Sequence, residues 1–317
     1  MRFVVYGQNK HLGVLQEERI LDLASAALAA GREPEQFHSL INLIESGERG
    51  LDTVRELMER NEESEAPGLH VDITSVELHA PFPGRRFALA GSNNPDHVAN
   101  ALVNRGRDVT SEQVRTSTRE GPGGGFWVVA PPVGPGAAIE VPRSSRGLLD
   151  FEGEVAVVLS RGGKRIPAAG WSDRIWGTVL VIDWSIRSQS IDSSKRPFYA
   201  HKIFDNSKSL GPWISVGEVD PLNCEVETRV NGELRQKFRS GDMIHTYAEL
   251  LEQISEDFTL MPGDVLSGGT GAGTAVDATL PGDSGELPLT LFLKTGDRVE
   301  VSAPNLGTLT GTIVAGT

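Results

Sequence analysis

Two glutamates separated by a single residue begin an apolar stretch in the middle of the chain. Glu152 and Glu154 stand in the run DFEGEVAVV, and the residues after Glu154 predict a buried strand. Strand side chains alternate between faces, so both carboxylates project from the same face. Two carboxylates this close do not both stay ionised in a semi-buried place unless a cation neutralises them. The pair therefore indicates a cation site or, like many Glu-x-Glu pairs, a solvated strand end.

A third acidic residue, Asp183, ends a strongly apolar strand over residues 179–182. An unpaired charge is costly at such a position. Asp183 could pair with Arg187 or cap a turn, or it could be a third oxygen ligand beside the two glutamates. Ligation by carboxylates without a nearby Cys or His suits Mg²⁺ or Mn²⁺ better than Zn²⁺.

Other polar residues have both an ordinary and a functional interpretation. Lys202 follows a basic, polar loop, where it is either a surface charge or a group that binds a substrate carboxylate. His97 begins a short helical pattern, and a lone histidine is more often structural than catalytic. The glycine-rich stretch 262–273 lacks the spacing of a phosphate-binding loop. Nothing around Cys224 indicates a nucleophile.

The elements that must position these residues are mainly strands. Residues 1–78 predict a small α/β domain, with short strands followed by helical spacing, and a proline-rich hinge over 80–85 follows it. Residues 79–317 predict a larger β-rich domain with a sandwich or barrel-like architecture. Within it, Asn231-Gly232 predicts a hairpin and residues 242–260 a helix. Residues 98–125 are polar and glycine-rich, which predicts a poorly packed, mobile segment.

Charge and composition exclude several classes of partner. The 317 residues carry a net charge of −13, which argues against a nucleic-acid or anionic-membrane surface. No apolar run approaches the roughly 20 residues of a spanning helix. The first ten residues read as a strand and lack the features of a signal peptide, so we expect a cytoplasmic protein. A single cysteine excludes an internal disulfide and a multi-cysteine metal site.

Taken in order, these stretches resemble the fumarylacetoacetate hydrolase family, including its acylpyruvate hydrolase, oxaloacetate decarboxylase and 2-hydroxyhepta-diene-dioate isomerase branches. The resemblance covers about residues 80–315, and residues 1–78 are similar to the small amino-terminal domain of many members. Five motifs carry it, namely D-x-E-x-E at 150–154, the D-x-S-x-R run at 183–187, K-x-F-D at 202–205 with Gly211-Pro212, Met243-Ile244 with Glu249-Leu250-Leu251, and the P-G-D-V run at 262–273.

The resemblance implies a mixed β-roll, a homodimer and a bound Mg²⁺ or Mn²⁺, with Ca²⁺ as a possible non-catalytic occupant. Glu152, Glu154 and Asp183 would hold this metal. Substrates would be 2-oxo or 1,3-dioxo acids. The resemblance also implies that Arg187 and Lys202 bind the substrate carboxylate or the developing oxyanion. Thr270 and Gly269 would line the pocket. His97 would act on the reacting carbon under a lid.

Three departures from the family pattern bear on the reaction. Asn100 stands where the family lid motif has a glutamate that orients the histidine and activates water. Val128 replaces a lysine, and Gly268 and Gly271 replace the Thr and Pro of T-G-T-P. We therefore expect a metal-dependent hydrolase of a C–C bond, and keep as alternatives a lyase or isomerase on the same substrates and a binding protein without turnover. A histidine without a carboxylate partner is a weaker base, which adds weight to the lyase or isomerase alternative but leaves the hydrolase as the leading expectation.

Overall fold

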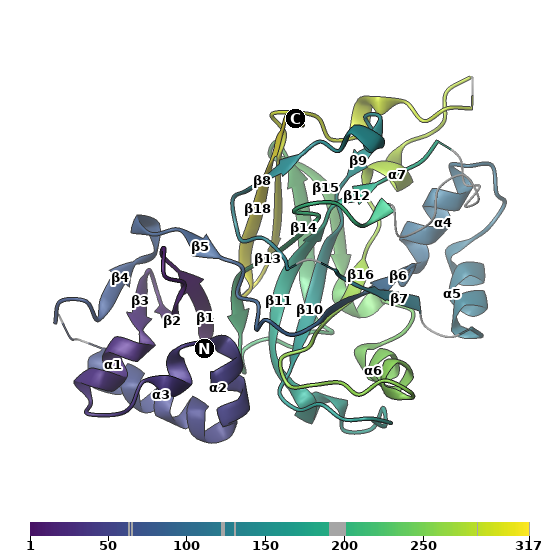
Figure 1. Cartoon of the computed structure of the whole chain (residues 1–317). Helices are drawn as coiled ribbons and strands as arrows, with labels where there is room; N and C mark the ends of the chain where they lie inside the picture. The colour runs from purple at the N-terminus through teal and green to yellow at the C-terminus, as the bar shows by residue number, and fades with distance from the viewer. Residues whose placement is uncertain are drawn as a thin grey trace.

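The computed structural model describes residues 1–62, 64, 66–121, 124–129, 131–189, 201–283 and 285–316. A smaller amino-terminal part lies beside a larger part built mainly of strands (Figure 1). In the described residues no helix is both long enough and apolar enough to cross a membrane.

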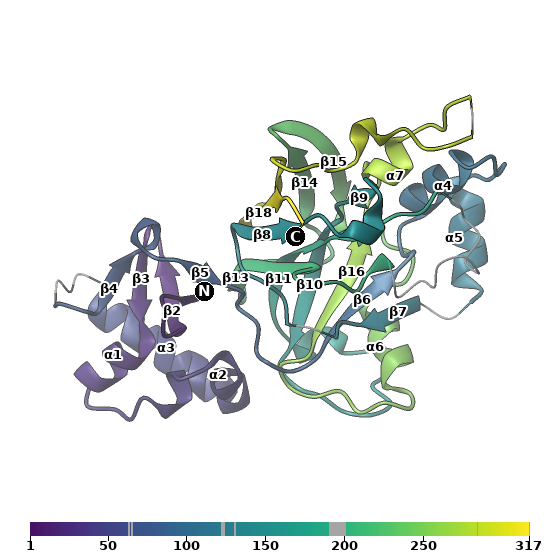
Figure 2. The ribbon, with the colours of Figure 1, turned by 45° about the horizontal axis from the view of Figure 1, so that its top comes forward.

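The amino-terminal part is a short-stranded sheet with helices on one side (Figure 2). Its elements are β1 (Arg2–Tyr6), β2 (His11–Gln16), β3 (Arg19–Asp22), β4 (His70–Asp72), β5 (Leu78–His79), α1 (Leu23–Ala29), α2 (Leu40–Ser46) and α3 (Glu48–Asn61). The helical spacing after residue 37 forms two helices rather than one. Gly47 separates them with a φ of 64°, a conformation that glycine adopts without steric cost.

One sheet runs through both parts of the chain, which the sequence did not predict. Strand β1 pairs with β13 (Lys208–Ser215), with Phe3 opposite Ile214. In the described residues the sheet has eleven strands, in the order β4-β3-β2-β1-β13-β11-β10-β16-β6-β7 with β5 beside β1. The strands not yet bounded are β6 (Phe87–Gly91), β7 (Gly124–Trp127), β10 (Gly153–Leu159), β11 (Ile175–Asp183) and β16 (Val265–Thr270).

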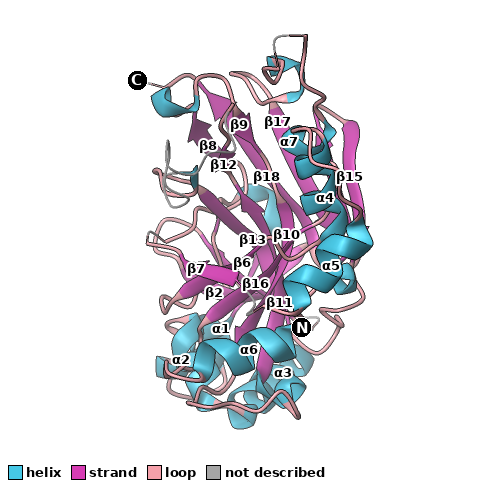
Figure 3. Ribbon diagram, turned by 90° about the vertical axis from the view of Figure 1, so that its right-hand side faces the viewer, coloured by secondary structure: helices cyan, strands magenta, loops and turns pink. Residues whose placement is uncertain are grey.

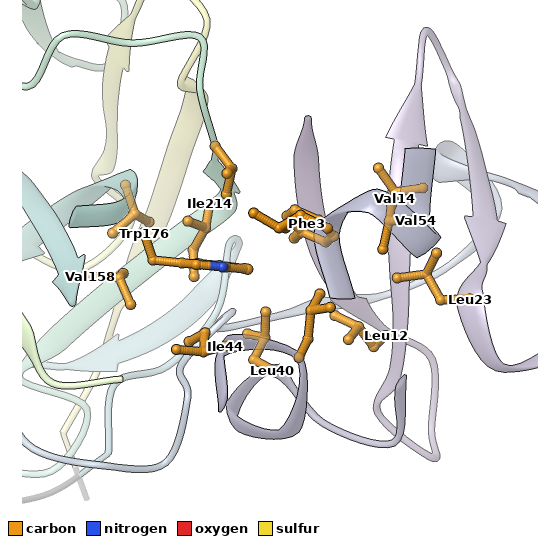
Figure 4. Packing of buried hydrophobic residues seen from close by; sticks show 14 of the residues in the cluster. Phe3, Leu12, Val14, Leu23, Leu40, Ile44, Val54, Val158, Trp176 and Ile214 are labelled. Atoms are coloured by element: carbon orange, nitrogen blue, oxygen red, sulfur yellow. The ribbon is translucent and has the colours of Figure 1, made fainter. Parts of the chain in front are cut away.

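A continuous apolar core accompanies this shared sheet (Figure 4). Phe3 of β1 packs on Trp176 of β11, with ring centroids 5.1 Å apart. Ile44 of α2 lies in the same cluster. The two parts are joined by backbone pairing and by a common core, and the domain boundary near residue 79 stays a prediction.

A second sheet packs on the first and completes the β architecture. Val155 and Leu180 of the large sheet contribute to one core with Val226 and Val301 of the second. The second sheet has the order β15 (Glu233–Arg239), β14 (Glu225–Val230), β17 (Arg298–Ala303), β18 (Gly307–Val314) and β8 (Ala137–Glu140). The predicted mainly-β fold class is confirmed, while the separate small α/β domain stays a prediction. The predicted hairpin at 231–232 joins β14 to β15.

Helices border one side of the larger part (Figure 3). The helix predicted over 242–260 is shorter, α6 (Tyr247–Ser255), because Thr246 and Glu249 form a capping box at its start. Residues 98–125, which we expected to be poorly packed, differ more from the prediction than this helix does. It contains α4 (Pro95–Val103) and α5 (Ser111–Arg119), and Ala99 and Val114 form a small core with Ile244. Local sequence patterns could not predict this packing, because Ile244 lies 130 residues further along the chain than Val114. The role of residues 98–125 as a lid stays a prediction.

Candidate active site

The three predicted carboxylates meet at one place in the large sheet. Glu154 lies at the start of β10 and Asp183 at the end of β11, and these antiparallel neighbours bring the two ends together. Glu152 immediately precedes β10. Each of the three offers an oxygen within 4.8 Å of the others, and all three residues are at most 5% exposed. The geometry thus excludes the solvated strand end as an explanation of the glutamate pair.

Lys202 lies among these carboxylates. Its Nζ donates to Glu152 Oε2 at 2.6 Å, to Asp183 Oδ2 at 2.7 Å and to Ser185 Oγ at 2.6 Å. The side chain is buried, so it is not the surface charge that sequence reasoning left open. In this structure the ammonium contacts protein carboxylates, and its contact with a substrate stays a prediction.

Arg187 also contacts the acidic cluster, through Asp150 and Glu152. Its Nε donates to Asp150 Oδ2 at 2.8 Å, and its Nη2 donates to Glu152. Asp150 also accepts the backbone N–H groups of Ala275 at 2.7 Å and Val276 at 3.1 Å. We did not assign a role to Asp150 from the sequence, although it is the first residue of the D-x-E-x-E motif. It connects Arg187 to the short helix α7 (Ala275–Ala278).

The two glutamates differ in their electrostatic surroundings. Burial raises the pKa of Glu152, but Lys202 and Arg187 outweigh this and hold the pKa well below its usual range. Burial and the carboxylates of Asp183 and Glu152 raise the pKa of Glu154 well above its usual range. Its Oε2 accepts a hydrogen bond from Ser267. Glu154 therefore needs a further positive charge nearby in order to ionise in its usual pH range.

The donor set fits a hard divalent cation. All three groups supply oxygen, and their oxygens lie within 4.8 Å of one another. Ligands of one octahedral ion at about 2.1 Å lie about 3 to 4.2 Å from each other, which falls within this limit. The Oδ1 of Asp183 is buried and accepts no hydrogen bond from the described residues. Lys208 Nζ lies 2.8 Å from this oxygen, without hydrogen-bond geometry. Burial lowers the pKa of this lysine, while Asp183 opposes the shift.

His97 lies beside the carboxylates and has an acidic partner. It is in the first turn of α4, where Asn94 caps the helix by accepting its backbone N–H at 3.1 Å. Nε2 is 3.8 Å from Glu152 Oε1, and Nδ1 is 2.7 Å from Asp277 Oδ2. Our expectation of a histidine without a carboxylate partner is therefore wrong. Asp277 lies 180 residues away, and no local pattern in the sequence points to it.

A small cavity brings the site residues together. Its volume is about 60 Å³, and its lining includes His97, Glu152, Glu154, Arg187, Lys202 and Thr270. The Thr270 hydroxyl donates to Gly153 O at 2.9 Å and accepts from Gln236 Nε2 at 2.9 Å. Gly269 has a φ of 87°, and a Cβ there would lie 3.1 Å from Ala90 O. Depressions of about 520 and 640 Å³ lie elsewhere on the molecule, away from this acidic cluster.

Comparison with known proteins agrees with this geometry. Residues 88–314 match the model of the fumarylacetoacetate (FAA) hydrolase C-terminal family. The chain belongs to the fumarylacetoacetate hydrolase family. Over 308 aligned residues it is 28% identical to oxaloacetate tautomerase YisK of Bacillus subtilis strain 168. The aligned region covers 95% of this chain and 94% of that protein.

Solved structures of the family share the fold. One is the crystal structure of maleylpyruvate hydrolase from Sphingobium sp. SYK-6 in complex with manganese(II) and pyruvate, with a TM-score of 0.71, 21% identity and 100% coverage of both chains. Another is 5-carboxymethyl-2-hydroxymuconate delta-isomerase from Mycobacterium smegmatis, with a TM-score of 0.60 and 27% identity over 79% of this chain and 86% of that one. The proteins that this chain is similar to thus include a hydrolase, an isomerase and a tautomerase.

Proposed function

We propose that this protein is a divalent-metal-dependent hydrolase that cleaves a C–C bond in a 2-oxo or 1,3-dioxo acid of the acylpyruvate type. The observation that carries the proposal is the cluster of three buried carboxylates beside His97. His97 lines the same cavity as Glu152 and Glu154, and its Nε2 lies 3.8 Å from Glu152 Oε1. The Mn²⁺ and pyruvate in the maleylpyruvate hydrolase structure support the same pairing of metal and 2-oxo acid.

Glu152, Glu154 and Asp183 would hold Mg²⁺ or Mn²⁺, with Ca²⁺ as a non-catalytic occupant. When bound, the cation supplies polarisation of the 2-oxo group and stabilisation of an enolate. Lys202 now donates to two of the three carboxylates, so a dication at the same carboxylates would repel it. Its ammonium and the Arg187 guanidinium would then be available to the substrate carboxylate, while Thr270 and Gly269 line the cavity.

His97 would act as the general base. Its ring lines the cavity, and the described residues offer no hydrogen-bond partner to its Nε2. In a hydrolase, Nε2 accepts a proton from the attacking water. The bond from Nδ1 to Asp277 stabilises the imidazolium that forms.

The second candidate function is keto–enol tautomerisation of a 2-oxo acid. It is one of the lyase and isomerase reactions kept as alternatives in the sequence analysis. It is favoured by the similarity to oxaloacetate tautomerase over 95% of the chain. The same residues serve it, with His97 moving a proton to or from the carbon beside the 2-oxo group. It differs from hydrolysis in that no water attacks the substrate.

One experiment separates these reactions. The protein is incubated in D₂O with Mg²⁺ or Mn²⁺ and a panel of acylpyruvates, oxaloacetate and other 2-oxo acids, and products are followed by proton NMR. Two acid fragments identify the hydrolase, CO₂ release a decarboxylase, and deuterium uptake without cleavage a tautomerase. No change with any substrate, while metal binds, would favour the non-catalytic binding protein. The homodimer and the cytoplasmic location stay predictions.

A further inference from the structure

The contact between His97 and Asp277 joins two distant elements beside the acidic cluster. His97 is fixed in the first turn of α4, and Asp277 lies in α7 and is 5% exposed. The same two elements meet a second time, because Asn104 at the end of α4 donates to the Asp277 carbonyl oxygen at 2.8 Å. The two bonds together fix the rotation of α4 against α7.

The hydrogen bonds at Asp277 favour a proton on Nδ1 of His97. Its carboxylate accepts the backbone N–H of Gly273, at 2.9 Å to Oδ1 and 3.1 Å to Oδ2. Burial raises the pKa of Asp277, and the bonds from His97 and from the Gly273 backbone oppose that shift. A backbone N–H can only donate, so it favours the ionised carboxylate, which then accepts a hydrogen bond from His97 Nδ1. The neutral ring then has its lone pair on Nε2, the nitrogen that lies nearer Glu152.

Asp277 is also connected to the acidic cluster. The backbone N–H groups of Ala275 and Val276 in α7 donate to Asp150, and Asp150 accepts from Arg187. Arg187 donates to Glu152 as well. A continuous chain of hydrogen bonds and peptide backbone therefore runs from Asp277 to the carboxylates, which fixes the position of His97 relative to them.

We propose that Asp277 is the positioning residue of His97 and takes the role that the family resemblance assigns to a lid glutamate, here replaced by Asn100. The carboxylate is supplied from α7, beside Asp150, instead of from the helix that carries the histidine. This inference rests on the proposed role of His97 as base and adds the group that sets its tautomer and orientation.

The test compares Asp277→Asn with wild type and with Asp22→Asn. Asp22→Asn removes an equally buried carboxylate from the amino-terminal part, where it accepts hydrogen bonds from Tyr6 and Ser25. Asp277→Asn is expected to lower kcat by about 100-fold, the usual scale of a general-base contribution, with little change in KM. Asp22→Asn is expected to leave kcat unchanged in folded protein. A wild-type kcat in Asp277→Asn overturns the proposal.

A second readout does not depend on turnover. Nitrogen NMR of ¹⁵N-histidine-labelled protein reports the tautomer of His97, which is assigned by its disappearance in His97→Gln. The wild-type ring is expected to be protonated at Nδ1, and Asp277→Asn is expected to shift it toward the Nε2-protonated form. An unchanged tautomer in the variant overturns the proposal. Because this readout uses resting protein, it stands even if the substrate class proposed above proves wrong.

Discussion

Lys202 Nζ lies 2.7 Å from Asp183 Oδ2 and is simultaneously bonded to Glu152, so a lysine and a metal ion would compete for the same oxygens. Lys202→Met removes the competing charge and is expected to tighten Mn²⁺ binding by about tenfold, which corresponds to about 1.4 kcal/mol. Titration calorimetry of the metal-free protein measures this directly. The same variant should lose turnover, since the substrate carboxylate loses a partner. Weaker metal binding in Lys202→Met would contradict the competition.

Glu154→Gln tests the metal site without disturbing the fold. Burial and neighbouring carboxylates raise the pKa of Glu154, so its protonated form in the metal-free protein resembles a glutamine amide. We expect the variant to keep the melting temperature of the metal-free wild type. Metal at 100 times its Kd should stabilise the wild type by about 2.7 kcal/mol and the variant far less.

The measurement is thermal unfolding with and without Mn²⁺, after treatment with a chelator. Glu249→Gln serves as the control, because Glu249 lies at the start of α6 and, in the described part of the chain, its carboxylate bonds to Thr246 and Arg119 and not to the acidic cluster. An equal metal-induced shift in Glu154→Gln and in wild type would remove Glu154 from the ligand set.

Cys224 should behave as an inert thiol with a strong pH dependence. Burial raises its pKa to about 11, with a smaller opposing contribution from Ser240. Only about one molecule in a thousand then carries the thiolate at pH 8, and this fraction rises about tenfold per pH unit below the pKa. The rate of reaction with a disulfide reagent should follow the same slope between pH 7 and 9. A fast reaction at pH 7 would contradict the buried position.

Phe3→Ala should destabilise the whole molecule and not only its amino-terminal part. Phe3 is fully buried against Trp176, and its strand pairs with β13. Removal of a buried phenylalanine side chain costs about 3–5 kcal/mol. We expect one unfolding transition in urea, shifted to lower concentration when followed by tryptophan fluorescence. Two transitions, with that of the larger part unshifted, would show that the parts unfold independently.

The sequence was most informative where neighbouring residues carry the signal. The spacing of Glu152 and Glu154 on one strand, and the apolar run before Asp183, located the acidic cluster because strand periodicity and burial are local properties. The sequence could not show that Asp277 reaches His97, because their contact depends on how α4 packs against α7. The β1–β13 pairing was also not predictable, since nothing in a short strand specifies a partner such as Ile214, which is 211 positions away from Phe3.

Asn100→Glu distinguishes a missing carboxylate from one supplied elsewhere. Residues three apart on a helix are neighbours, so a glutamate at position 100 would lie near His97. Because Nδ1 already donates to Asp277 at 2.7 Å, the single substitution is expected to leave kcat unchanged. In the Asp277→Asn background the same substitution should raise kcat at least about tenfold above that of Asp277→Asn alone, since general-base efficiency depends on a correctly oriented histidine. Steady-state rates of the four proteins, on whichever substrate the NMR panel identifies, form a double-mutant cycle. A rise in kcat for Asn100→Glu in the wild-type background would mean that Asp277 leaves His97 incompletely oriented.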